Sequence, residues 1–257
     1  MAKLRFLGTC SGTEPFENMH HTSFLIEEKG KTYWFDAGEN CSRLAFLQGV
    51  DMLSVSSIFI SHPHIDHIGG LLGLLLLIRQ QIWRKDGNPI DGEVKLFAPS
   101  DALWENLHHL INVADSGLFS VMDVTSKTIK DGLVFDNGDI RVTALHNAHM
   151  GVPENGTWRS YSFGIEVAGR KIVYSGDIAQ LSELDALVDS GCDMLICESG
   201  HQKVAEILAY AEKKGIERLR FIHHGREIIN DRAAAEELAK QYPHSAIITY
   251  DGMTEEI

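Results

Sequence analysis

Short runs of alternating or continuous apolar residues recur along the chain, separated by turn residues and by longer amphipathic segments. The short runs predict β-strands, because successive side chains of a strand point to opposite faces of its sheet. A continuous apolar run such as Ile58–Ile60 predicts a strand that is buried on both faces. The expected strands are Lys3–Leu7, Thr22–Glu27, Thr32–Asp36, Ser57–Ser61, Val94–Ala98, Ile140–Leu145, Tyr161–Val167, Lys171–Ser175, Asp193–Cys197, Arg218–Ile222 and Ala246–Tyr250.

Apolar residues spaced three and four apart predict helices between these strands. The expected helices are His67–Lys85, Ser100–Val113, Leu181–Ser190, His201–Lys214 and Asp231–Gln241. Strand hairpins interleaved with helices predict an α/β (α+β) layered fold, in which two mixed sheets carry helices on their outer faces. No Pro- or Gly-rich linker divides the sequence, so we expect one domain over residues 1–257.

The composition narrows the class of protein. A chain of 257 residues can bury a large core, and values of 44% hydrophobic and 23% charged residues exclude collagen-like, disordered and coiled-coil proteins. Lys and Arg number 23 against 36 Asp and Glu, which gives a formal net charge of −13. This balance argues against a protein that grips nucleic acid by neutralising its phosphates.

Three features of the sequence predict a cytoplasmic protein with no membrane partner. No apolar run approaches the roughly 20 residues that a membrane-spanning helix needs. The first residues, Met1–Gly8, lack the apolar core and cleavage site of a secretory signal. The four cysteines form no CxxC pair, so we expect reduced thiols.

Three of the 13 histidines fall within one ten-residue segment, SHPHIDHIGG at residues 61–70. It follows a buried strand and precedes a helix, which is where sites of α/β proteins commonly form. His62 and His64 can aim their rings in the same direction, and Asp66 and His67 follow at the helix start. Three imidazoles and a carboxylate suit Zn²⁺, with Mn²⁺ and Fe as alternatives. Random placement would produce this arrangement in roughly two of a thousand such chains, so the motif predicts a metal site.

Together with four other motifs, this segment resembles the metallo-β-lactamase fold hydrolase superfamily, and within it the ribonuclease Z-like, phosphodiesterase branch. FLGTCSGT at residues 6–13 resembles the opening "LGTGSG" loop of that branch, and FDAGE at 35–39 its "DxGEG" turn. SGD at 175–177 resembles the branch's "SGD" turn, and LICE at 195–198 its "LIxE" strand end. The similarity spans nearly the whole chain.

The resemblance implies a four-layer αββα sandwich of two mixed β-sheets flanked by helices, with two metal ions between the sheets. The ligand set that it implies is His62, His64 and His149 for one ion, Asp66, His67 and His223 for the other, and Asp177 bridging both. Two divalent ions about 3.5–4 Å apart can generate a bridging hydroxide and stabilise both oxygens of a phosphoryl displacement. Zn²⁺ is the expected metal.

One of these ligands has a competitor that the residues alone allow equally. His146 and His149 both follow the same expected strand. We prefer His149, because it is nearer to the next strand, as the family pattern requires. The other histidine is then an ordinary loop residue or supports a ligand.

The last ligand poses the same choice between His223 and His224. His223 follows its strand directly and lies 22 positions after His201 (223 − 201), the spacing between the "HST" histidine and the last ligand in ribonuclease Z-like proteins. The resemblance therefore gives His201 the role of acid that protonates the leaving oxygen. Its alternative is a residue that caps backbone amides at a helix start, and His224 either hydrogen-bonds substrate or packs.

Four further residues near these motifs have open roles. His20 and His21 lie in the loop that follows the first strand and either contact substrate or face solvent. Cys10 and Cys41 are expected to pack, with a reactive thiol as the alternative.

The sequence also departs from the ribonuclease Z pattern. The inserted arm with which transfer-RNA-processing members grip their substrate is missing, because His149 and Asp177 are only 28 positions apart (177 − 149). The "HST" triplet is His201-Gln202-Lys203, and no basic patch is present. These departures argue for a small or flexible phosphodiester and against an extended nucleic acid.

We therefore predict a metal-dependent hydrolase, a phosphodiesterase in which Asp66 positions a metal-bridging hydroxide and His201 acts as acid. Ribonuclease Z-like processing of RNA, or hydrolysis of a lactone or thioester at the same centre, are the alternative activities. A non-catalytic metal-binding protein is the alternative from another class. Dimers are common among the resembled proteins, so a homodimer is one oligomeric state that the resemblance allows, and the sequence does not determine it.

Overall fold

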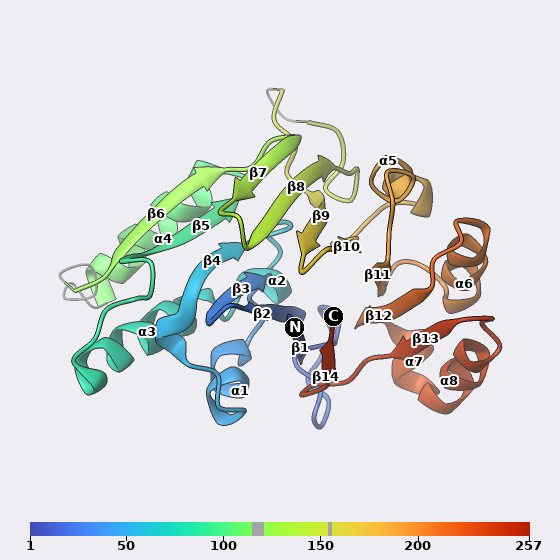
Figure 1. Ribbon diagram of the computed structural model, residues 1–257, viewed down its shortest axis with the longest axis horizontal. Coiled ribbons are helices and arrows are strands. Elements are labelled where there is room, and N and C mark those ends of the chain that lie inside the picture. Colours follow the sequence, from blue (N-terminus) through green and yellow to red (C-terminus); the bar gives the residue numbers. More distant parts are fainter. Residues whose placement is uncertain (115–120, 154–155) are drawn as a thin grey trace.

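The chain forms two seven-stranded sheets that face each other, with helices on their outer faces (Figure 1). The computed structural model describes residues 1–114, 121–153 and 156–257. Each sheet contains both antiparallel and parallel pairs, as the sequence pattern predicts. No helix in these described ranges has both the length and the apolar character needed to cross a membrane.

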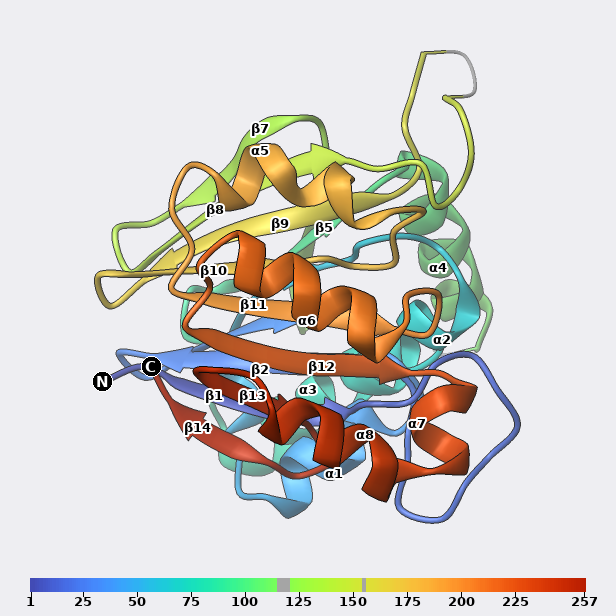
Figure 2. The same ribbon diagram turned by 90° about the vertical axis from the view of Figure 1, so that its right-hand side faces the viewer.

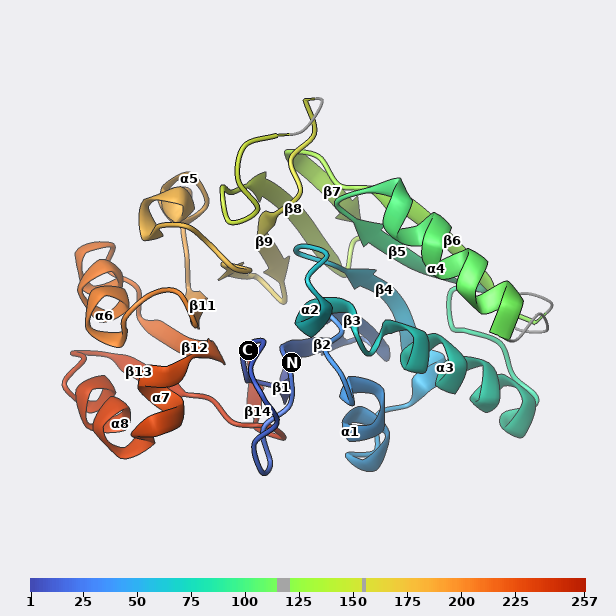
Figure 3. The ribbon, with the colours of Figure 1, turned by 180° about the vertical axis from the view of Figure 1, so that it is seen from behind.

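The first sheet has the strand order β14-β1-β2-β3-β4-β5-β6. Its strands are β1 (Lys3–Gly8), β2 (Ser23–Glu28), β3 (Lys31–Phe35), β4 (Val55–Phe59), β5 (Glu93–Ala98), β6 (Asp123–Thr128) and β14 (Thr254–Glu256). The helical elements of this half are α1 (Cys41–Leu47), the 3₁₀ turn η1 (Met52–Ser54), α2 (Ile65–Ile68), α3 (Leu71–Lys85) and α4 (Asp101–Ala114). Figure 3 shows α3 and α4 lying along the outer face of this sheet.

The second sheet has the order β13-β12-β11-β10-β9-β8-β7. Its strands are β7 (Gly132–Asp136), β8 (Ile140–His146), β9 (Tyr161–Val167), β10 (Arg170–Tyr174), β11 (Met194–Ser199), β12 (Arg218–His224) and β13 (Ser245–Ile248). The helical elements over it are η3 (Leu181–Leu184), α5 (Asp185–Val188), α6 (Val204–Lys213), α7 (Arg226–Asn230) and α8 (Arg232–Lys240).

Aromatic side chains fill the space between the sheets. Phe24, Phe35, Phe59 and Phe97 come from adjacent strands β2 to β5, and their rings stack at centroid distances of 4.9–5.0 Å. Because side chains alternate along β3, Phe35 faces this central core while its neighbour Trp34 packs against the helices. Burial of each such side chain contributes about 2–3 kcal/mol, so this layer holds the sheets together.

The predicted helix over residues 67–85 is interrupted. α2 ends at Ile68, and α3 begins at Leu71 after Gly69 and Gly70. Gly70 packs directly on the backbone, since a Cβ there would lie 2.1 Å from the Gly38 carbonyl oxygen. The break lets the segment turn away from the site before α3 runs along the sheet.

Two other predicted helices differ from the structure. The expected helix Leu181–Ser190 is the turn η3 followed by the short α5. The helix expected from His201 begins only at Val204, so His201 lies in the loop after β11 and does not open the helix. This corrects the helix-start interpretation of His201.

The last strand of the chain lies beside the first. β14 pairs antiparallel with β1, and the Ile257 N–H donates to the Ala2 carbonyl at 3.0 Å. Figure 2 shows both termini at the same side of the molecule. The last strand thus returns from the second sheet to the edge of the first.

Candidate metal centre

Segments that follow several strands meet at one edge of the sandwich and bring together the histidines and aspartates singled out in the sequence. β4 leads to His62, β8 to His149, and β10 to Asp177, while His223 lies within the end of β12. Their ligand atoms fall into overlapping groups with separations below 4.8 Å: His62, His64, His149 and Asp177; Asp66, His67 and His223; and Asp177, His201 and His223. All eight residues that the sequence pointed to are in these groups.

The first group, here the triple-histidine cluster, consists of His62, His64 and His149, with Asp177 at its inner side. His64 Nδ1 lies 3.0 Å from His62 Nε2 and 3.2 Å from His149 Nε2. Asp177 Oδ2 lies 3.7 Å from each of the ring nitrogens His62 Nε2 and His149 Nε2. Burial and the neighbouring His67 hold the pKa of His62 well below its usual range, so the ring is neutral and keeps a lone pair for a metal.

The second group, here the Asp66 cluster, consists of Asp66, His67 and His223. Asp66 Oδ2 lies 3.2 Å from His223 Nε2 and 3.6 Å from His67 Nε2. Asp177 joins this cluster too, with Oδ1 3.4 Å from His67 Nε2 and Oδ2 3.2 Å from His223 Nε2. Burial would raise the pKa of Asp177, but His223 and His67 hold it well below the usual range, so the carboxylate is ionised.

His67 is supported from behind by Asp36, which sequence reasoning did not single out. The fully buried Asp36 carboxylate accepts from His67 Nδ1 at 2.8 Å, from Tyr174 Oη at 2.6 Å and from the Ser61 hydroxyl at 2.8 Å. Burial lowers the pKa of His67, but Asp177 and Asp36 outweigh it and hold the pKa well above the usual value. Asp36 belongs to the FDAGE motif, which was the signal available in the sequence.

A bulge in β12 places His223. The register against β11 shifts between the pairs Glu198–Ile222 and Ser199–His224, so His223 is the extra residue. His223 has φ 53°, a left-handed conformation that is uncommon for a residue with a side chain. The bulge therefore turns the His223 ring toward the Asp66 cluster.

His224 is fully buried and points away from the centre. Its Nε2 lies 2.9 Å from the Thr249 carbonyl, and its Nδ1 lies 3.2 Å from the Ser199 hydroxyl. Burial lowers its pKa to about 3, so the ring is neutral. Of the two roles considered for His224, the structure favours packing.

His146 also lies outside the clusters. Its Nδ1 is 2.6 Å from Asp131, and its ring stacks on Trp158 with centroids 4.0 Å apart. The structure thus places His149, and not His146, beside His62 and His64.

His201 reaches the centre from the loop between β11 and α6. Its Nδ1 lies 3.3 Å from Glu198 Oε1 and 3.8 Å from Asp177 Oδ2. Glu198 is fully buried, and its other oxygen accepts from the backbone N–H groups of Gly200 and His201 at 2.7 and 2.8 Å. The hydrogen bond to Glu198 raises the pKa of His201, which favours the protonated form that an acid needs.

The four residues with open roles pack around the opening loop. His20 Nδ1 bonds Asp251 at 2.7 Å, and His21 Nδ1 lies 2.6 Å from Glu39. Cys10 and Cys41 are buried. Burial raises the pKa of both thiols, to about 12 for Cys41, so the packing interpretation is supported.

The donor set fits divalent metal ions. Within the described residues, His67 Nε2 and Asp177 Oδ1 are buried without a hydrogen-bond partner. Buried polar atoms without hydrogen bonds are costly, and these two atoms lie 3.4 Å from each other. Neutral imidazoles combined with carboxylates are ligands that zinc accepts. A cavity of about 210 Å³ opens onto the clusters, lined by residues that include Gly12, His64, Asp66 and His201.

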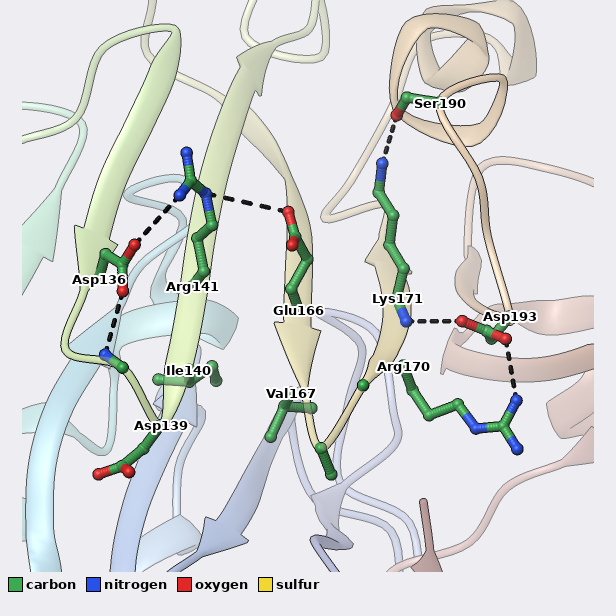
Figure 4. A pocket seen from close by; sticks show the side chains of 13 residues that line it. Asp136, Asp139, Ile140, Arg141, Glu166, Val167, Arg170, Lys171, Ser190 and Asp193 are labelled. Carbon is green, nitrogen blue, oxygen red and sulfur yellow. Dashed lines mark hydrogen bonds and ion pairs between the residues drawn. The ribbon is translucent and has the colours of Figure 1, made fainter.

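A larger cavity, about 560 Å³, lies at the turns β7–β8 and β9–β10. Figure 4 shows that Arg141 and Arg170 pair with carboxylates of the same cavity, while the Lys171 ammonium contacts the Ser190 hydroxyl. Arg141 lies 3.1 Å from Asp136 and 3.9 Å from Glu166, and Arg170 lies 3.1 Å from Asp193. Asp139 pairs with Lys29 at 3.0 Å, outside the cavity. Because these charges already have partners and no histidine in the described part of the chain lines the cavity, it offers no ligand set comparable to the histidine clusters.

Comparisons with known proteins agree with this geometry. The model of the family described as "Anti-Pycsar protein Apyc1" matches residues 2–236. The chain is 26% identical to ribonuclease Z of Methanothermobacter thermautotrophicus over 87% of this chain and 86% of that protein. The human short-form tRNase Z superposes with a TM-score of 0.74 at 20% identity, covering 99% of both chains. The metallo-beta-lactamase fold protein YhfI from Bacillus subtilis gives a TM-score of 0.76 at 17% identity, covering 99% and 98%. The predicted fold is therefore confirmed.

Proposed function

We propose that this chain, which belongs to the Anti-Pycsar protein Apyc1 family and is a metal-dependent hydrolase of the metallo-β-lactamase fold, hydrolyses a small cyclic phosphodiester, a cyclic nucleotide. The observation that carries the proposal is the placement of two potential ligand clusters around Asp177, with His201 3.8 Å from the same carboxylate. Two-metal centres of this kind suit displacement at phosphorus.

The ligands proposed for the two ions are those that the resemblance implied. His62, His64 and His149 hold one ion, Asp66, His67 and His223 hold the other, and Asp177 serves both. Bound there, two divalent ions lower the pKa of water and stabilise negative charge on the phosphoryl oxygens. Zinc is the proposed metal because imidazole nitrogens dominate the donor set.

Asp66 and His201 have separate roles in proton transfer. Asp66 faces the cavity and orients the attacking water by accepting its hydrogen bond. Gly12 allows this approach, since a Cβ there would lie 2.8 Å from Asp66 Oδ2. His201, whose pKa is raised by the hydrogen bond to Glu198, donates a proton to the leaving oxygen of the sugar.

The site favours a small substrate over an extended RNA. The cavity at the clusters measures about 210 Å³, and only 28 positions separate His149 from Asp177, too few for a gripping arm. The net charge of −13 opposes a large polyanion along the surface. Two divalent ions would bring roughly four positive charges to the centre itself, so a single phosphodiester is still attracted there.

The test is a substrate panel on protein loaded with Zn²⁺, Mn²⁺ or Fe²⁺ in separate preparations. We expect hydrolysis of cyclic mononucleotides to linear nucleotides, loss of turnover after chelation, and no turnover in a His62→Ala or Asp177→Ala variant. Faster hydrolysis of a lactone or thioester would contradict the phosphodiesterase proposal. Strong, salt-dependent cleavage of precursor transfer RNA would favour the ribonuclease alternative.

A further inference from the structure

The two ligand clusters are built differently, and we propose that the Asp66 cluster binds its metal ion first and more tightly, because Tyr174 and Asp36 position His67. This inference concerns the order and strength of metal binding. It is independent of which bond the loaded centre hydrolyses.

The first difference is the number of carboxylates. The Asp66 cluster has Asp66 and Asp177 beside the His67 ring nitrogen, at 3.6 and 3.4 Å, and Asp36 behind the same ring at 2.8 Å. The triple-histidine cluster has only Asp177, at 3.7 Å from His62. A divalent cation is attracted by each nearby carboxylate, so charge favours the Asp66 cluster.

The second difference is how well the donor atoms are already satisfied. His67 Nε2 and Asp177 Oδ1 are buried and have no hydrogen-bond partner among the described residues. In the triple-histidine cluster, His64 Nδ1 instead lies within 3.2 Å of both neighbouring rings. A metal must separate existing contacts in either cluster, since Asp66 Oδ2 also lies 3.2 Å from His223 Nε2. In the Asp66 cluster the metal additionally gives partners to two buried atoms that lack hydrogen bonds.

The third difference is the support of the ligand rings. Asp36 can only accept hydrogen bonds, so the 2.8 Å contact requires a proton on His67 Nδ1. His67 Nε2, the ring nitrogen left for the metal, then faces Asp66 and Asp177. His62, by contrast, has only the Ser61 hydroxyl beside its Nδ1, at 3.0 Å. Such supporting bonds fix the tautomer and orientation of a metal-binding histidine.

Tyr174 in turn positions Asp36. It comes from β10 in the second sheet, while Asp36 follows β3 in the first, and the two meet at 2.6 Å with both side chains buried. The tyrosine hydroxyl is a donor here because the carboxylate offers no proton. Tyr174 is therefore a positioning residue that acts on the metal through Asp36 and His67.

The experiment is a Zn²⁺ titration of chelator-treated full-length protein in competition with a chromophoric zinc chelator. For the unmodified chain we expect two binding steps of different affinity. Tyr174→Phe should weaken the tight step by roughly 10–100-fold and leave the weak step unchanged. Tyr33→Phe is the matched control, because Tyr33 is an equally buried tyrosine of the same core whose hydroxyl bonds Asn137 at 2.9 Å.

Ligand variants identify which cluster provides each step. His64→Ala should remove the weak step and keep the tight one, and His223→Ala should remove the tight step. Loss of the tight step in His64→Ala, or unchanged affinities in Tyr174→Phe, would overturn the proposal. Asp36→Asn, which retains the side-chain shape, should likewise weaken the tight step and replaces Tyr174→Phe if that variant does not fold. Because Asp36 also bonds the Ser61 hydroxyl beside His62, only the tight step of this variant is compared. None of these readouts depends on turnover.

Discussion

His201 is the residue whose proposed chemistry depends most on one neighbour. Its side chain is 44% exposed, whereas Glu198 beside it is fully buried and anchored by two backbone N–H groups. The buried carboxylate stays in place while the exposed imidazole can meet a substrate. A histidine paired in this way is suited to donate a proton and to recover it from water.

Replacement of His201 by Gln should lower kcat for a cyclic nucleotide by about 10²–10⁴-fold, because the leaving alkoxide then lacks a proton donor. For an ester with a nitrophenolate leaving group the loss should be much smaller, since that group leaves without a proton. Metal content should stay unchanged. A matched His146→Gln variant, outside the clusters, should keep full activity. Loss of a metal ion from the His201 variant would instead identify His201 as a ligand.

Replacement of Glu198 by Gln should change the pH profile of kcat. The hydrogen bond to Glu198 raises the pKa of His201, so it keeps the acid protonated to higher pH. Without the carboxylate the pKa falls, and the decline of activity with rising pH should begin at lower pH than in the unmodified enzyme. The profile of kcat against pH measures this directly, and an unshifted basic limb would show that His201 is not the acid.

At the residue scale, the sequence indicated the residues with donor atoms but not those that support them. His62, His64, Asp66 and His67 stand in one short motif, so spacing alone identifies them. The link between Asp36 and Tyr174 spans 138 positions and forms only when the two sheets face each other. The FDAGE motif contains Asp36, but no local pattern identifies Tyr174 as its partner.

At the scale of elements, the glycines after the histidine motif decide where the chain turns. Gly70 packs on the Gly38 carbonyl and on Cys41 Sγ, so no side chain fits. At Gly73, one turn further along α3, an added Cβ would meet only the Ser42 hydroxyl, at an ordinary contact distance of 3.7 Å. A close backbone contact therefore requires glycine at position 70, whereas position 73 has room for a methyl group.

Gly70→Ala should lower the free energy of unfolding by about 3 kcal/mol, because a methyl group would clash with backbone atoms that cannot move aside. Gly73→Ala should be neutral or stabilising by up to about 1 kcal/mol, because Ala favours the helix and the space is open. Denaturant-induced unfolding of the two variants measures both values. Equal stability of the two would show that the loop adjusts without cost.

Strands with a buried face were predictable, whereas three of the four edge strands, β6, β7 and β14, were not; the edge strand β13 was predicted over 246–250. β2 and β9 are buried along most of their length and match the apolar runs closely. β6, with the sequence DVTSKT, has no fully buried residue, and β14 is only three residues long. Their positions are determined by pairing with β5 and β1, which the local sequence does not encode.

At the scale of the whole molecule, the two sheets are joined by charged residues as well as by their shared core. Arg218 and Arg220 of β12 in the second sheet both bond Glu255 of β14 in the first sheet. The Arg220 side chain is 2% exposed, and its Nε donates to Glu255 at 2.7 Å. The C-terminal strand thus connects the halves that together form the metal centre.

Glu255→Gln should lower the free energy of unfolding by about 3 kcal/mol at neutral pH, because it leaves the buried Arg220 without its counter-charge. Burial would raise the pKa of Glu255, but Arg220 and Arg218 hold it below its ordinary value of about 4.5. A carboxyl whose pKa is lower in the folded chain adds stability that is present above the unfolded value and lost as the pH falls through the folded one. The difference in free energy of unfolding between Glu255→Gln and the unmodified chain should therefore shrink below about pH 4.5.

The exposed pair Lys240–Glu237 supplies the control, because Glu237→Gln should lower the free energy of unfolding by less than about 1 kcal/mol. Urea unfolding of both variants across this pH range measures these free energies. If the difference between Glu255→Gln and the unmodified chain stays constant with pH, the charge of Glu255 does not hold the sheets together.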